Sequence, residues 1–304
     1  MSVPLKTPRK AENKILQADS LKPVAWLIHG FSTRPGGFSK TYGGRSLNLG
    51  FTQQDSRAAV EQNRARFLRH LGAVSKGREW PLVTVRQIHS DLIHCVDEVP
   101  KSLVRKSPTP NSVLVGDGLI TRMSGILLAI LTADCLPVIL VDVKRRAVGV
   151  FHAGWRGTLI RIVEKGVGEM HRRFGTSPRD LRAAIGPGVH GCCYAVGAEV
   201  RTQFESQFEY GSKLFHEVEE SDPVREKYPL LFLTARAPGH SVLPKKIFLD
   251  LVEANRGQLL AAGVAAKHIY ASPFCTACRT DLLFSYRAEK GVTGRMMTVA
   301  GIRV

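Results

Sequence analysis

Short apolar segments rich in β-branched residues recur along the chain and alternate with longer amphipathic segments. The short segments are typical of buried strands, because they carry many Val and Ile residues and end at polar or glycine-containing turns. We predict strands at 24–30, 82–89, 92–97, 126–135, 137–143, 147–152, 181–186, 282–287 and 296–304. Strands are therefore expected over most of the chain.

Three longer segments place apolar residues at the three-to-four-residue spacing of one helix face. Ser56 is positioned to cap the first of them, since a serine side chain accepts a hydrogen bond from the first helical turn. A glycine follows each segment and favours the left-handed conformation that ends a helix. We predict helices over 56–71, 159–174 and 248–260, ended by Gly72, Gly175 and Gly263.

The connections between strands restrict the fold class. Segment 144–146, between the strands at 137–143 and 147–152, is too short to hold a crossover helix, so these two strands must be antiparallel. No GxGxxG or Walker sequence is present, which argues against a doubly wound nucleotide-binding fold. We predict an α+β fold with mixed, largely antiparallel sheets in a single domain over 21–304, preceded by a flexible basic tail at 1–20.

The composition is that of a globular cytoplasmic protein. Hydrophobic residues make up 44% of the 304 positions and charged residues 23%. No apolar run reaches the roughly 18 residues of a membrane helix, and no apolar segment follows the basic N-terminus as in a secretory signal. Six cysteines are too few for a disulfide scaffold in a chain of this length. We therefore expect a reducing, cytoplasmic environment and no membrane partner.

The formal net charge of +17 raises the question of a nucleic-acid partner. Such a charge attracts anions, but its residues are scattered along the chain and accompany no known nucleic-acid-binding motif. A binder of DNA or RNA would show strong salt dependence. We interpret the charge as a solvated basic surface and expect no nucleic-acid partner.

Three residues that are able to bind a metal each end a predicted strand: His89, Cys135 and His152. Strand ends are places where side chains from distant positions converge. One thiolate and two imidazoles suit Zn²⁺ or copper and leave a fourth position for water or substrate. The wide spacing forms no compact ligand motif, so ordinary buried or hydrogen-bonding roles remain an alternative.

Other chemistry-bearing residues give weaker signals. Cys275 and Cys278 form a CxxC pair, but no second CxxC completes a structural zinc site. Cys192 and Cys193 are adjacent and are expected to pack rather than to chelate one ion. Asp134 precedes Cys135 and could orient a ligand or serve a turn.

A series of motifs resembles the family called polyphenol oxidase or laccase-domain proteins, and also purine nucleoside phosphorylase/adenosine deaminase. The motifs are HGFSTRPGGFS, SLNLG, VRQIHS, GDGLITR, TADCLP, HAGWRG, AAIGPGVHGCCYAVGAEV, PFCT, FSYR and TGRMM, in this order. The match runs from about residue 24 to the C-terminus. It departs from the family at Ala195, where an acidic residue is common, and in a long loop at 101–112. The resemblance implies a single-domain α/β/β/α sandwich with a metal site at Cys135, His152 and His89.

The resemblance also implies an activity. We expect a metal-dependent purine nucleoside enzyme that performs phosphorolysis of adenosine, inosine and S-methyl-5′-thioadenosine and hydrolytic deamination of adenosine. Zinc suits deamination, because it lowers the pKa of a bound water to about 7; copper would allow weak polyphenol oxidation. The ten histidines include no HxH pair, so a multicopper cluster is not expected. The expected partners are purine nucleosides and phosphate, with the protein a monomer or homodimer.

The residues are given these roles. Cys135, His152 and His89 are the predicted metal ligands and catalytic residues, and Arg156 is expected to meet phosphate at a helix N-terminus. The predicted substrate-binding residues are Arg34, Asn48, Gln87, Tyr194 and Arg287. The alternative is a metal-free cysteine hydrolase, in which Cys135 is the nucleophile, His152 the base and the substrate an amide bond such as those of cell-wall precursors.

Overall fold

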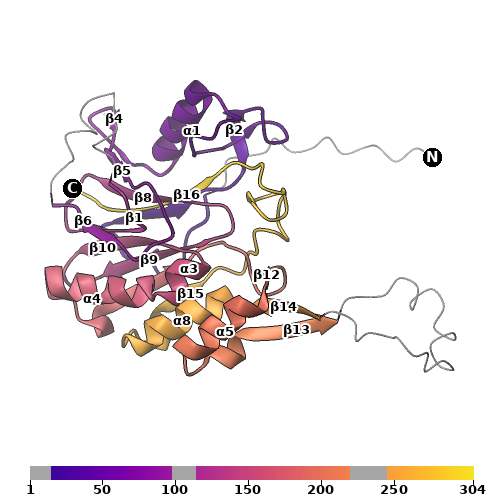
Figure 1. Ribbon diagram of the computed structural model, residues 1–304. Helices are drawn as coiled ribbons and strands as arrows, with labels where there is room; N and C mark the ends of the chain where they lie inside the picture. The colour runs from indigo at the N-terminus through magenta and orange to yellow at the C-terminus, as the bar shows by residue number, and fades with distance from the viewer. Residues whose placement is uncertain (1–14, 98–113, 220–244) are drawn as a thin grey trace, which may run out of the picture.

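Two β-sheets pack face to face, with helices covering both outer faces (Figure 1). The computed structural model describes residues 15–97, 114–219 and 245–304. The larger sheet has six strands and the smaller sheet has four. The predicted α/β/β/α sandwich with mixed sheets is confirmed.

The six-stranded sheet is the larger wall of the sandwich. Its strands in spatial order are β15 (Ile269–Ala271), β11 (Leu181–Ile185), β9 (Leu136–Asp142), β10 (Ala147–Ala153), β7 (Gly118–Thr121) and β6 (Ile93–Cys95). The central pairs are antiparallel, as the short connection 144–146 requires. The edge strands β15 and β6 pair in parallel with their neighbours.

The four-stranded sheet is the second wall. It consists of β1 (Leu27–Phe31), β16 (Met296–Ile302), β8 (Leu127–Thr132) and β5 (Leu82–Thr84), with only the edge pair β5–β8 parallel. The remaining strands lie outside these two sheets: β2 (Pro35–Ser39), the pair β3 (Val74–Ser75) and β4 (Arg78–Glu79), and a three-stranded sheet of β12 (Ala195–Val196), β14 (Lys245–Leu249) and β13 (Phe215–Glu219).

The helices lie on the outside. Helix α1 (Arg57–His70) packs on the four-stranded sheet, where the buried side chain of Phe67 belongs to one cluster with Ala129 and Val299. The helices α3 (Trp155–Leu159), α4 (Ile162–Phe174), α5 (Ala198–Gln207) and α8 (Leu251–Ala261) lie on the side of the six-stranded sheet (Figure 1). Among the described residues, no helix is long and apolar enough to cross a membrane.

Alternation along the central strands builds the core. In β9, Val138 and Leu140 face the helices, whereas Ile139 and Val141 face the other sheet. This period of two is the period of a strand with both faces covered, so every residue of β9 is buried. Burial of this kind is the main favourable term in folding, and it fixes the register in which β9 and β10 present the site.

The predicted helices are found with shifted boundaries. The Ser56 hydroxyl accepts from the Ala59 amide at 3.2 Å and caps α1, as predicted. The helix predicted over 159–174 is α4 and begins only at Ile162, because Arg161 takes a left-handed conformation with φ 64°; Leu159 is the last residue of α3. The third begins only after Asp250, since Phe248 belongs to β14.

Several other predictions also need correction. Strand β5 ends at Thr84 rather than at residue 89, and residues 282–287 form turns rather than a strand. Residues 15–20, placed in the flexible tail, pack on the domain: Ala18 is fully buried and Leu16 pairs with Phe31. The loop at 101–112 and most of the predicted tail lie outside the described residues.

Candidate functional site

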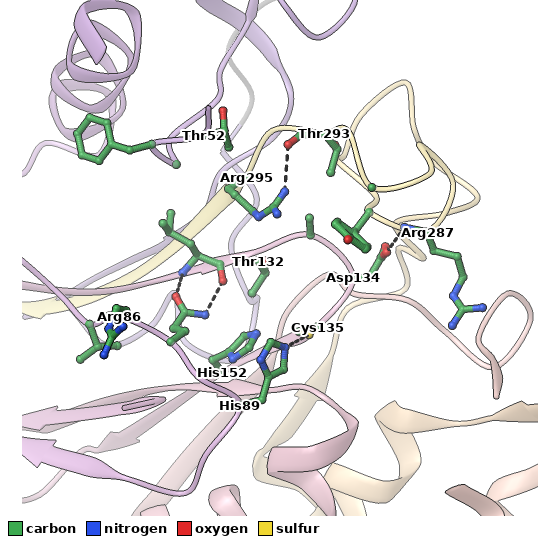
Figure 2. Close-up of a pocket in the computed structure, with 18 of the residues that line it drawn as sticks. Thr52, Arg86, His89, Thr132, Asp134, Cys135, His152, Arg287, Thr293 and Arg295 are labelled. Atoms are coloured by element: carbon green, nitrogen blue, oxygen red, sulfur yellow. Dashed lines mark hydrogen bonds between the residues drawn. The ribbon is translucent and has the colours of Figure 1, made fainter. Parts of the chain in front are cut away.

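The three predicted metal ligands meet in space. The ligand atoms of His89, Cys135 and His152 all lie within 4.8 Å of one another. The Cys135 sulfur is 3.8 Å from Nε2 of His89, and the two imidazole rings meet edge to face with centroids 4.9 Å apart (Figure 2). The sequence therefore identified a true cluster.

The strand-end argument explains the position of His152 near the end of β10, but β8 ends at Thr132, so Cys135 lies in the turn before β9 and not at the end of a strand. His152 lies in β10 and pairs with Pro137 of β9, so Cys135, just before β9, lies at the same end of this antiparallel pair. His89 does not end a strand. It lies in the loop after β5, with a left-handed φ of 61° that is uncommon for a residue with a side chain.

Gly154 shows why this corner requires a glycine. A Cβ atom at this position would lie 2.9 Å from the Cys135 sulfur and 3.0 Å from Cδ2 of His89. Any side chain here would occupy the space between the two candidate ligands. The absence of a side chain at Gly154 therefore leaves space between Cys135 and His89 for an atom that both residues bind.

Asp117 organises both histidines, and sequence reasoning missed it. It is fully buried, and its carboxylate accepts from Nδ1 of His152 at 2.8 Å and from the His89 amide at 3.0 Å. The same carboxylate accepts from the Ser90 amide and hydroxyl, both at 2.7 Å, so it also fixes the His89 loop. An aspartate between two glycines in GDG was the available signal.

The electrostatics of the cluster favour a thiolate. Burial alone would raise the pKa of the Cys135 thiol, but His152 and His89 lower it overall to about 6. Burial would lower the pKa of His152, but Cys135 and Asp117 raise it to about 9. Burial opposes ionisation of Asp117 as well, yet hydrogen bonds from His152 and Ser90 hold the pKa of its carboxyl far below the usual range.

These features fit a bound metal ion. Since Nδ1 of His152 is engaged with Asp117, Nε2 is left to coordinate, which is the usual orientation of a metal-binding histidine held by a carboxylate. The donor set of one sulfur and two nitrogens suits Zn²⁺ or copper. Among the described residues, this is the one histidine-containing group with metal-ligand geometry.

A cavity of about 940 Å³ opens beside the cluster. It is large enough for a drug-sized ligand. All three cluster residues line it, and so do three arginines that ring it from different segments: Arg86, Arg287 and Arg295 (Figure 2). Two half-exposed aromatic rings, Phe51 and Tyr286, also line it.

Of the predicted substrate-binding residues, Gln87, Tyr194 and Arg287 line this cavity. The side-chain amide of Gln87 is occupied, because it donates to the Leu131 carbonyl at 2.7 Å and accepts from the Leu131 amide at 2.8 Å. The Arg287 guanidinium lies 4.9 Å from the centroid of the Tyr194 ring. Tyr194 and Arg287 thus form one side of the cavity together.

The structure places the other three predicted residues away from the cavity lining. Arg156 is exposed on α3, with its guanidinium 4.5 Å from the Trp155 ring. Arg34 forms an ion pair with Glu289 at 2.9 Å. Asn48 is fully buried, where it donates to a neighbouring carbonyl and carboxylate and accepts from the Arg295 amide.

Asp134 has a bracing role next to Cys135. Its carboxylate accepts from the hydroxyls of Thr276 and Ser285 at 2.6 and 2.7 Å, and from the Arg287 amide at 2.7 Å. The Asp134 carboxylate therefore hydrogen-bonds to the segments around Thr276 and Ser285, which lie beside the cavity. We infer that Asp134 holds this wall in place.

Fold and cluster together define a class of protein: an α/β/β/α sandwich in which a Cys–His–His group lines a basic cavity. Comparison with known proteins then gives the family. The family model described as multi-copper polyphenol oxidoreductase laccase matches residues 28–303. The chain belongs to this family.

The relatives carry enzyme names. The chain is 36% identical over 281 residues to purine nucleoside phosphorylase YlmD of Geobacillus stearothermophilus, covering 92% of each protein. It is 35% identical over 218 residues to adenosine deaminase RL5 of an unknown prokaryotic organism, covering 71% of this chain and 73% of that protein. The crystal structure of YlmD from Geobacillus stearothermophilus has a TM-score of 0.74 at 33% identity, covering 98% of this chain and all of that one.

Proposed function

We propose that this protein is a cytoplasmic, metal-dependent purine nucleoside enzyme that uses phosphate to cleave adenosine, inosine and S-methyl-5′-thioadenosine and also deaminates adenosine. The observation that carries the proposal is the Cys135, His89 and His152 cluster beside a cavity ringed by arginines. The names of the relatives support the choice of substrate. The six free cysteines are consistent with a reducing compartment.

His89, Cys135 and His152 would hold the metal. We favour zinc, because the described residues offer no second histidine-containing group for the further copper ions of a multicopper oxidase. When bound, zinc supplies a Lewis acid that activates a water molecule for hydrolysis. Asp117 keeps the proton of His152 on Nδ1, so that Nε2 faces the metal position.

The cavity walls would bind the nucleoside and phosphate. Phe51 and Tyr286 are 49% and 53% exposed and would contact the purine base beside the arginines that already lie over their rings, Arg57 and Arg64 over Phe51 and Arg295 over Tyr286. Arg287 and Arg295 reach the cavity from the C-terminal segment and would bind phosphate oxygens through charge-assisted hydrogen bonds. Arg156 lies outside the cavity lining, so in this proposal its role passes to Arg287.

A metal-free cysteine hydrolase is the second candidate, in which amide bonds such as those of cell-wall precursors would be the substrate. Two observations favour this hydrolase. The pKa of the Cys135 thiol is lowered, and the hydrogen bond between His152 and Asp117 completes a Cys–His–Asp arrangement. His89 favours the metal enzyme instead, because a nucleophile and base need no second imidazole against the sulfur.

Chromatography of the products formed from adenosine tests the proposal. With phosphate, the zinc-loaded protein should release adenine and ribose 1-phosphate; with or without phosphate, it should release inosine. Adenosine that remains unchanged in both reactions would refute the proposed activity.

Arg287 and Arg156 form a matched pair for the phosphate site, since each guanidinium stacks on an aromatic ring. Arg287→Ala should lower kcat/KM for phosphate by about 10- to 100-fold, the value of a lost charge-assisted hydrogen bond of about 1.5–3 kcal/mol. Arg156→Ala should change it less than about twofold. Equal losses in the two variants would contradict this placement of phosphate.

A further inference from the structure

Four cysteines form a second cluster on the same protein, at a distance in sequence from the Cys–His–His group. Cys192 and Cys193 lie on the turn after β11, and Cys275 and Cys278 lie on the turn after β15. The four sulfur atoms all lie within 4.8 Å of one another. Sequence reasoning kept the pairs apart, because the 81 positions between Cys193 and Cys275 show nothing that joins them; the sandwich brings them together.

The sulfur separations fit a shared metal ion. Cys278 lies 3.4 Å from Cys193 and 3.6 Å from Cys192, sulfur to sulfur. Four thiolates at the usual zinc distance of about 2.3 Å stand about 3.8 Å apart at the corners of a tetrahedron. A disulfide would require about 2.05 Å. The arrangement is therefore close to that of a four-cysteine zinc site.

Local backbone geometry supports the same reading. The turn at 190–194 is closed by hydrogen bonds from the Cys193 and Tyr194 amides to the His190 carbonyl, both at 3.0 Å, and this turn lets two adjacent cysteines face one point. The His190 amide in return donates to the Cys275 sulfur at 3.4 Å. An amide donor of this kind stabilises a thiolate.

We propose that Cys192, Cys193, Cys275 and Cys278 bind a structural zinc ion. Four protein ligands close the coordination shell, so this ion has a structural role, unlike the site with three ligands and an open position. The cluster joins two turns, and the residue that follows a cysteine in each turn, Tyr194 or Thr276, contributes to the wall of the cavity beside the Cys–His–His group. Tyr194 lines the cavity, and the Thr276 hydroxyl donates to Asp134, the neighbour of Cys135.

The zinc would therefore hold the cavity wall. Besides the His190–Cys275 hydrogen bond, the two turns are joined by the Thr276 amide, which donates to the Gly188 carbonyl at 2.9 Å, and by the Gly188–Cys275 bridge. A metal cross-link adds a strong constraint at this point, because binding to a site formed only in the folded state stabilises the fold.

Metal analysis of the reduced, zinc-loaded protein tests the proposal. The wild-type protein should hold about two zinc equivalents, and Cys135→Ala should keep about one. Cys278→Ser should lose about one, whereas Cys95→Ser should lose none, because Cys95 bonds to Asp97 outside both clusters. This pattern does not depend on any activity, so it is separate from the test of the proposed function.

Cobalt gives a second measurement if Cys278→Ser fails to fold. Cys135→Ala retains the four cysteines, and its Co²⁺ complex should show the strong thiolate-to-cobalt charge-transfer band of a tetrahedral four-sulfur site. Cys135→Ala that binds neither zinc nor cobalt would overturn the proposal. So would a disulfide between the two pairs in freshly purified protein, or one tightly bound iron in place of zinc.

Discussion

At the scale of single residues, the candidate site depends on groups that support the three ligands. The buried Asp117 carboxylate fixes His152 directly and fixes His89 through the amides of its loop. The triad itself was indicated by the predicted strand ends and by the resemblance of motifs, although its wide spacing forms no compact ligand motif. Asp117 was not singled out, since a carboxylate that acts through hydrogen bonds differs from other aspartates in the sequence only by its place in the GDG motif.

The ionisation of Cys135 can be measured in protein stripped of metal. Because the pKa is lowered to about 6, the thiolate persists at pH 7 and is lost as the pH falls below about 6. The rate of alkylation of Cys135 by iodoacetamide, followed by peptide mass spectrometry, should be nearly constant from about pH 8 to 7 and fall below about pH 6.

Cys95 provides the internal control. Burial raises the pKa of its thiol to about 12, and Asp97 adds to the effect, so at neutral pH it should react at least about 100-fold more slowly than Cys135. A Cys135 rate that still rises about tenfold from pH 7 to 8 would show an ordinary thiol and contradict the described electrostatics.

At the scale of elements, periodicity predicted the central strands well and the connections poorly. β9 and β10 differ from their predicted bounds by about one residue, because continuous burial leaves a strong apolar signal. Segment 282–287 forms turns although it begins with three apolar residues, because Leu283 and Phe284 pack in a small cluster with Tyr42 and with Met296 at the start of β16. The packing partner Tyr42 is far away in the sequence, so the local pattern of residues 282–287 could not show that they form turns.

The sequence stretch FHAGWRG shows how one element positions the site. β10 ends at Ala153, and Gly154 leads into α3 where a Cβ atom would press on both the Cys135 sulfur and the His89 ring. The sequence shows that a glycine stands at such a position. Only the fold shows which atoms a side chain at that position would clash with.

A pair of glycine substitutions tests this role. Gly154→Ala should lose about one of the two zinc equivalents together with the activity, because the new methyl group lies within 3.0 Å of two ligand residues. Gly168→Ala should keep both and raise the free energy of unfolding by about 0.5–1 kcal/mol, since Gly168 lies on an exposed helix position with no atom near its Cβ. Zinc content and thermal unfolding measure the two outcomes; full zinc binding by Gly154→Ala would contradict the account.

At the scale of the whole molecule, the sandwich collects the cavity from segments far apart in the chain. The walls come from residues near 50, 87, 134, 152, 194 and 290, and two turns held beside Asp134 close the C-terminal side. The resemblance of motifs predicted this architecture as a whole. Of the cavity arginines, Arg287 was among the predicted substrate-binding residues, whereas Arg86 and Arg295 were assigned only from the structure, because a sequence with 43 Lys and Arg residues does not indicate which of them meet.

Metal removal and return is the most direct test of the central claim. Adenosine turnover should be abolished by a chelator and restored by Zn²⁺ in the wild-type protein, whereas Cys135→Ala, which keeps the four-cysteine cluster, should regain none. Circular dichroism before and after chelation checks that the fold persists. Turnover that resists the chelator and is then abolished by iodoacetamide would contradict the metal enzyme and establish Cys135 as a nucleophile.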